Sequence, residues 1–268
     1  MSDKQRRRSF PSYPFPSAVF IRLLWAALHS PPQNRSFGAD ARRCVAALRP
    51  SLRVDGREHI PTQGPCLLTI NHYAWPASDD AAIFRAWWLA LGVSAVVPAE
   101  IHWIVTAAWT YPDPLRAHLV TPVTRWLFRR VARVYGFTSM PPMPPDPDDV
   151  VARAAAVRRI LAYARTSTNP LIGMAPEGSD APGGVVQMPP SGAGRFIAHL
   201  ARLGLRIVPV GGFEADGAFC LRFGPAYALE TPAALSAAER DCAVSAVVMR
   251  HIAALLPAHL RGEFVCDA

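Results

Sequence analysis

A short strand that ends in a histidine is the sequence feature that most constrains the fold of this chain. Residues 67–70 are strand-forming, follow a Gly-Pro pair and stop abruptly at Asn71 and His72, and Pro76 lies four residues further on. Such a run between turn signals is typical of a short strand buried in a sheet. Because open α/β sheets bind their ligands at the carboxyl ends of the strands, His72 stands where such a fold places its chemistry.

A second stretch of the chain repeats this pattern. Residues 171–175 read as a buried strand that ends at Pro176, Glu177 and Gly178. Two strand ends of this kind would converge on one pocket and bring Glu177 close to His72. The alternative is a turn made by Gly178 in which Glu177 is solvated.

His72 is the candidate proton acceptor, because the unperturbed pKa of histidine is about 6.5. Asp79 and Asp80 follow it, and either carboxylate could orient the imidazole. In the alternative interpretation His72 is a hydrogen-bonded loop residue, and the two aspartates favour the start of a helix that Ser78 caps.

The order of the expected segments indicates an α/β layer fold, because strands alternate with helices. We expect three regions: a basic, proline-rich tail (1–17), N-terminal helices that contact a membrane or pack against the domain (18–50), and an α/β domain (51–268). The expected strands are 52–56, 67–70, 94–98, 134–138, 171–175, 206–210 and 218–223. The expected helices are 18–29, 39–48, 78–91, 115–134, 150–164, 191–203 and 232–256.

The charge of the chain narrows the classes of partner. Lysine and arginine number 28 against 20 acidic residues, and Lys4 is the only lysine. A basic surface suits nucleic acid, anionic lipid or an acidic substrate. No nucleic-acid recognition motif occurs, and the basic residues are not interleaved with aromatics, so no nucleic-acid partner is expected. The arginine-rich segment 115–134 favours a membrane surface instead.

No segment is expected to span a membrane, and no metal site is expected. The uncharged run 86–99 is shorter than the roughly 20 residues that a span requires. Five cysteines without a CxxC pair indicate reduced thiols in a cytosolic compartment and argue against a zinc site. Walker A, GxSxG and HExxH motifs are absent. A Ser-His-Asp triad stays open, although no serine stands out.

Taken together, the two strand ends and their surroundings resemble the lysophospholipid acyltransferase family, which carries the phospholipid/glycerol acyltransferase domain. The resemblance covers residues 52–229 approximately. The matching residues are Val54, Gly56, Glu58 and Pro61 in the lead-in; Asn71 and His72 of the NHxxxxD block; Pro176, Glu177 and Gly178 of the FPEGTR block; Gly192 and Ala198 in the helix that follows; and Val208, Pro209 and Val210 in the closing strand.

The chain also departs from the family pattern. Ala77 stands where the family has the Asp of its first block. Ala175, Ser179 and Asp180 replace the Phe, Thr and Arg of the second. The missing cations argue against a phosphate-bearing glycerol acceptor. Arg195, at the start of a helix, is the expected substitute anion ligand.

The resemblance implies a mixed, largely parallel sheet flanked by helices, with N-terminal helices. It implies transfer of an acyl group from acyl-CoA or acyl carrier protein, as co-substrate and without another cofactor, to a hydroxyl of a lipid-like acceptor. His72 would be the general base with Asp79 or Asp80 behind it. The expected substrate-binding residues are Asn71, Glu177, Gly178, Ser179 and Arg195. The protein would sit peripherally on the anionic, cytoplasmic face of a bacterial membrane. The alternative is a catalytically degenerate acyltransferase fold that binds a lipid or a partner.

Overall fold

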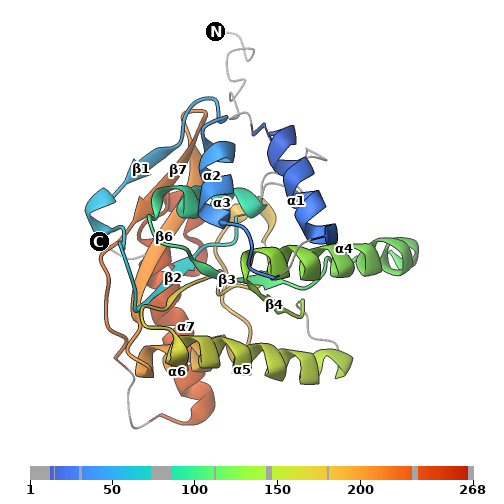
Figure 1. Cartoon of the computed structure of the whole chain (residues 1–268). Coiled ribbons are helices and arrows are strands. Elements are labelled where there is room, and N and C mark those ends of the chain that lie inside the picture. Colours follow the sequence, from blue (N-terminus) through green and yellow to red (C-terminus); the bar gives the residue numbers. More distant parts are fainter. Residues whose placement is uncertain are drawn as a thin grey trace.

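A largely parallel sheet forms the centre of the molecule, in a computed structural model that describes residues 13–14, 16–29, 32–73, 86–111, 113–142, 147–179, 181–230 and 235–264. Within these ranges the strands are β1 (Arg53–Asp55), β2 (Cys66–Ile70), β3 (His102–Thr106), β4 (Thr138–Met140), β5 (Leu171–Met174), β6 (Arg206–Ala215) and β7 (Ala218–Phe223). Their order is β1-β7-β6-β2-β5-β3-β4 (Figure 1). The strands from β6 to β4 run parallel, β7 is antiparallel to β6, and β1 is parallel to β7. The predicted mixed, largely parallel α/β sheet is therefore confirmed.

Helices cover both faces of this sheet. They are α1 (Ser17–His29), α2 (Phe37–Val45), α3 (Ala86–Val96), α4 (Pro114–Tyr135), α5 (Val150–Thr166), α6 (Ala193–Arg202) and α7 (Ala237–Ala253). Short 3₁₀ segments occur at Arg57–His59, Pro147–Asp149, Pro182–Gly184, Ala258–Leu260 and Gly262–Phe264. Helices α2 and α3 lie against one face, and α1 and α4 lie side by side near β4 (Figure 1).

The central strand β2 is buried on both faces, which is why its sequence is continuously apolar. Leu68 and Ile70 pack in the cluster formed with α2 and α3, whereas Leu67 packs in the cluster formed with α5, α6 and α7. Successive side chains of a strand point to opposite faces, so this one strand contributes to both cores.

Two expected strands were wrong in position. Residues 94–98 lie mainly in α3, and the Ser94 hydroxyl accepts a hydrogen bond from Nε1 of Trp103, in the strand that follows. A short apolar run does not distinguish a buried strand from a buried helix. Residues 134–138 also differ, because α4 extends to Tyr135 and ends at Gly136, which has a φ of 73°. The strand β4 begins only at Thr138.

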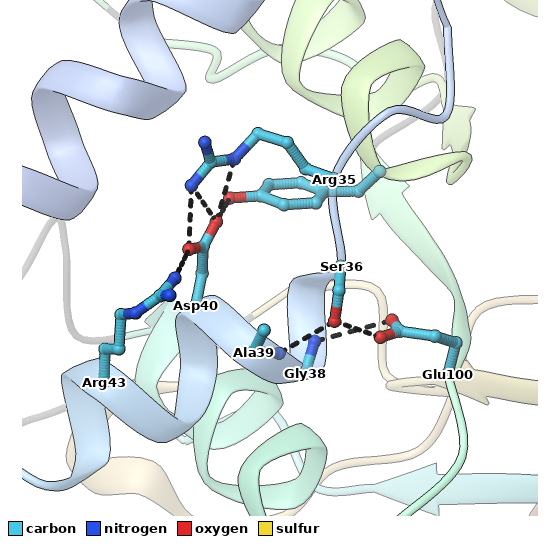
Figure 2. A network of polar contacts seen from close by, with 8 residues as sticks. Arg35, Ser36, Gly38, Ala39, Asp40, Arg43 and Glu100 are labelled. Atoms are coloured by element: carbon cyan, nitrogen blue, oxygen red, sulfur yellow. Dashed lines mark hydrogen bonds and ion pairs between the residues drawn. The ribbon is translucent and has the colours of Figure 1, made fainter.

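A buried aspartate ties the start of α2 to the end of α4. Asp40 accepts hydrogen bonds from the guanidinium groups of Arg35 and Arg43 and from the Tyr135 hydroxyl (Figure 2). Burial, together with the nearby Asp40 charge, raises the pKa of Tyr135, so its hydroxyl stays a donor. Beside this network, Ser36 caps α2 and also bonds Glu100. The connection between α1 and α2 is thereby attached to α4.

Candidate active site

The structure brings His72 and Glu177 together at the carboxyl ends of neighbouring strands. β2 and β5 pair in parallel, with Thr69 opposite Met174, so the turns that follow them meet. Glu177 Oε1 accepts a hydrogen bond from the backbone N–H of His72 at 2.6 Å, and Oε2 accepts one from the backbone N–H of Gln187 at 3.0 Å.

Glu177 is only 2% exposed, so it is not the solvated turn residue of the alternative interpretation. Both of its carboxylate oxygens accept from backbone groups. The geometry therefore gives Glu177 a role in holding the backbone at His72, and its expected contact with the acceptor stays a prediction. Gly178, the next residue, has a φ of 71°, which favours glycine and turns the chain back.

Asn71 lines the cavity beside His72 and is hydrogen-bonded within the protein. It is fully buried, its Nδ2 donates to the Gly212 carbonyl at 2.9 Å, and its Oδ1 accepts from the Gly212 N–H at 2.8 Å. A Cβ on Gly212 would come within 1.7 Å of the end of the Leu89 side chain, which would have to move aside. The pair of hydrogen bonds fixes the end of β2 to β6, and the predicted substrate contact by Asn71 stays a prediction.

A cavity of about 430 Å³ opens beside His72, within the range of roughly 300–1,000 Å³ that is usual for small-molecule sites. Its lining is largely aromatic and apolar, and includes Tyr73, Trp87, Trp103, Trp109 and Tyr111. An apolar chain beside a histidine is the kind of ligand that this lining suits.

The two predicted residues that follow Glu177 reach this cavity. Gly178 and Ser179 both line it. The Gln187 side chain donates to the Ser179 carbonyl at 3.1 Å and to its hydroxyl oxygen at 3.3 Å. Their position is compatible with substrate contact, which stays a prediction.

One wall of the cavity is attached to α4. The backbone N–H of Trp109 donates a hydrogen bond to the Thr124 hydroxyl at 3.2 Å, and that hydroxyl donates one to the Thr121 carbonyl at 3.0 Å. Phe128, on the buried face of α4, makes edge contacts with Trp109 and Trp87, at ring-centroid distances of 4.9 and 5.7 Å. The ligand cavity and α4 are therefore one packed unit.

Arg195 is not brought to this cavity. It lies exposed in the first turn of α6 and is not among the cavity's described lining residues. The anion at this helix start is Asp241 of α7, whose carboxylate accepts from the backbone N–H groups of Gly192 at 2.6 Å and of Arg195 at 2.7 Å. The backbone N–H groups at this helix start are thus satisfied from within the protein, and the expected role of Arg195 as an anion ligand stays a prediction.

The partners Asp241, Gln187 and Gly212 were missed by sequence reasoning. Asp241 lies 46 residues from Arg195 within a helical pattern, and Gly212 lies 141 residues from Asn71. Neither position carries a local signal of its contact. Asp79, Asp80, Ala77 and Asp180 lie outside the described residues, so the orienting carboxylate stays a prediction.

Two kinds of feature are absent from the described residues. No group of three or more His, Cys, Asp or Glu side chains that could hold a metal ion occurs among them. None of the helices described is both long and apolar enough to cross a membrane.

Comparisons with known proteins give a similar solved structure but no family. No protein-family model matches the chain, and no curated protein sequence matches it. Among solved structures the chain is similar to the 1-acyl-sn-glycerophosphate (LPA) acyltransferase PlsC from Thermotoga maritima, with 16% identity and a TM-score of 0.46. The match covers 89% of this chain and 81% of that one. These values are too low to assign a family, so function has to be argued from the site.

Proposed function

We propose that this protein is an acyltransferase that moves a fatty acyl group from a thioester donor to a hydroxyl of a lipid-like acceptor. The observation that carries the proposal is the contact between the His72 and Glu177 turns at the mouth of an apolar, aromatic-lined cavity. A proton acceptor beside a space for an alkyl chain is what acyl transfer to a lipid hydroxyl requires. The donor is acyl-CoA or acyl carrier protein.

In the proposed reaction the His72 imidazole takes the proton of the acceptor hydroxyl. The oxygen then attacks the thioester carbonyl carbon, and the negative charge moves onto the carbonyl oxygen. Backbone N–H groups at the strand ends stabilise that charge. The carbonyl re-forms as the carbon–sulfur bond breaks, and the leaving thiolate takes the proton from His72. Glu177 keeps the His72 backbone in place through its 2.6 Å hydrogen bond.

Helix α1 supports a membrane-bound acceptor, because it turns small residues toward the domain and a row of large apolar residues toward the outside. Its small residues Ala26 and Ala27 are buried in a cluster with Val134 of α4. Its large apolar residues face outward, at spacings that form one stripe, and Trp25 is 66% exposed. The stripe consists of Phe20, Ile21, Leu24, Trp25 and Leu28. Exposed apolar side chains in such a contiguous row are typical of an interface.

Helix α4 carries a second stripe of the same kind. Leu115, Leu119, Val123 and Trp126 are exposed at intervals of three or four residues, which places them on one face. Arginines accompany the stripe, namely Arg116, Arg125, Arg129, Arg130 and Arg133. Arg130 lies over the Trp126 ring at 5.7 Å and contacts the Ala27 carbonyl of α1 at 3.5 Å.

Apolar side chains combined with arginines suit the interface of an anionic bilayer, where both are stabilised. The buried face of α4 holds the cavity wall through Phe128 and Thr124. A lipid acceptor would therefore have a short path from a bilayer under α1 and α4 to His72. On this proposal the protein works at the inner, anionic surface of the membrane.

The test is acyl transfer by the purified protein, with acceptors chosen by lipid mass spectrometry of cells with and without it. His72→Ala should reduce transfer by about 10²- to 10⁴-fold without loss of folding, since His72 lies at a strand end. The exposed His259 provides the matched control, and His259→Ala should transfer normally.

Normal turnover by a folded His72→Ala protein would refute the mechanism. Absence of any product from the wild-type protein, together with retained lipid binding, would support the alternative of a catalytically degenerate binding protein.

A further inference from the structure

A second hollow, of about 230 Å³, lies between α6 and α7, and its described lining does not overlap with that of the cavity at His72. It is lined by Arg195, Ala198, His199 and Arg202 of α6 and by Ala237 and Arg240 of α7. The small side chains of the two alanines make room for the hollow, and every other residue of this lining has a basic side chain. We refer to it as the α6–α7 hollow.

Three of the basic groups follow one face of α6. Arg195, His199 and Arg202 stand at positions i, i+4 and i+7, which lie above one another on a helix. Nη1 of Arg202 lies within hydrogen-bonding distance of Nδ1 of His199, at 3.4 Å. Arg195 and Arg202 carry the permanent positive charges of this face, and an anion in the hollow would be attracted by both.

No carboxylate of the described residues lines the hollow, and none forms an ion pair with Arg195, Arg202 or Arg240. Two acidic residues are close in the sequence of α7. Asp241 accepts backbone N–H groups at the start of α6, and Glu239 accepts the Ser236 N–H in a capping box at 2.9 Å. Both carboxylates keep their negative charge, but each is hydrogen-bonded to backbone N–H groups at a helix start and does not line the hollow.

Arg240 is the basic side chain that α7 contributes to the hollow. Its Nη2 donates to the Leu235 carbonyl at 2.7 Å, which fixes the guanidinium. Its Nε is buried and has no hydrogen-bond partner within the described residues. A guanidinium carries five N–H donors, so the hydrogen bond to Leu235 leaves others that could bind an anion.

We propose that the α6–α7 hollow binds a phosphate group, supplied as free phosphate or as a soluble phosphate ester. Guanidinium groups recognise phosphate by paired, charge-assisted hydrogen bonds, and a hollow of this size admits one such group. The site does not depend on acyl transfer, since His72 takes no part in it.

Calorimetric titration of the full chain, in chloride buffer of constant ionic strength, tests the site with inorganic phosphate and with coenzyme A as an ester. We expect saturable binding, and about a tenfold weaker affinity in Arg202→Gln, because a hydrogen bond to a charged group is lost. Arg240→Gln should weaken binding in the same way. If Arg240→Gln fails to fold, Arg202→Gln still provides the test, because Arg202 is exposed. Arg250→Gln, at an exposed position on α7, is the matched control and should bind as the wild type does.

The two arms of the titration separate the sources. Tighter binding of phosphate assigns the site to the free ion, whereas tighter binding of coenzyme A assigns it to an ester. The proposal is overturned if neither binds, or if Arg250→Gln weakens binding as much as Arg202→Gln, since the attraction would then be that of the basic surface in general. A failure of acyl transfer would leave this result unaffected.

Discussion

Replacement of Glu177 tests how the turn that carries His72 is held. In Glu177→Ala the backbone N–H groups of His72 and Gln187 both lose their acceptor. Each unsatisfied buried group costs about 1–3 kcal/mol, and both residues are half-buried, so water replaces part of the loss. We expect the free energy of unfolding to fall by about 2–3 kcal/mol. Glu177→Gln keeps one acceptor oxygen, and we expect about half of that loss.

Urea unfolding measures this change, which corresponds to a shift of the midpoint by about 1 M for Glu177→Ala at the usual urea dependence of small proteins. At a temperature where the variants stay folded, kcat should fall by up to about 10²-fold, because small displacements of a catalytic group are costly. Glu263→Gln, at an exposed position, is the control and should change neither quantity. Wild-type stability in Glu177→Ala would refute the inference that this carboxylate holds the turn.

Two other predictions address the membrane surface and the pH dependence of folding. The protein should sediment with anionic vesicles and not with neutral ones, and high salt should weaken the binding. Trp25→Ser and Leu119→Ser should each weaken vesicle binding about tenfold. Val151→Ser on α5, where the side chain is 75% exposed, is the control and should not weaken it. Equal binding by all three variants would exclude α1 and α4 as the contact surface. Burial lowers the pKa of His102 to about 4, partly opposed by a backbone hydrogen bond to Gly136, so the unfolded chain binds a proton below about pH 6.5 that the folded protein excludes. The contribution of this residue to the free energy of unfolding is complete above that pH and declines by up to about 3 kcal/mol as the pH falls to 4. The free energy of unfolding in urea should therefore change less between pH 7 and pH 4.5 in His102→Gln than in the wild type. An equal change in both proteins would contradict the lowered pKa of His102.

Much of the fold was predictable because its signals are local. The continuous apolar runs at β2 and β5 indicate strands buried on both faces, and the alternation of strands with helices indicates the layered sheet. Parallel strands place their carboxyl ends at one edge, which is why the approach of Glu177 to His72 could be expected. The shifted strand at residues 94–98 shows the limit of this reasoning. A short uncharged run is compatible with a helix and with a strand, and only the structure shows that α3 continues to Val96.

The sequence by itself determined which elements form and which residues stand at the strand ends, because those properties depend on near neighbours in the chain. Tertiary structure alone decided what those residues contact. The contact between the Asn71 side chain and Gly212 exists only because β6 lies beside β2. The Asp241 carboxylate reaches the start of α6 only because α7 packs against that helix. The outward stripe of α1 was likewise undecided, because an amphipathic pattern does not say which face the domain covers. That choice was made by Ala26 and Ala27, whose small side chains allow α1 to pack closely against α4.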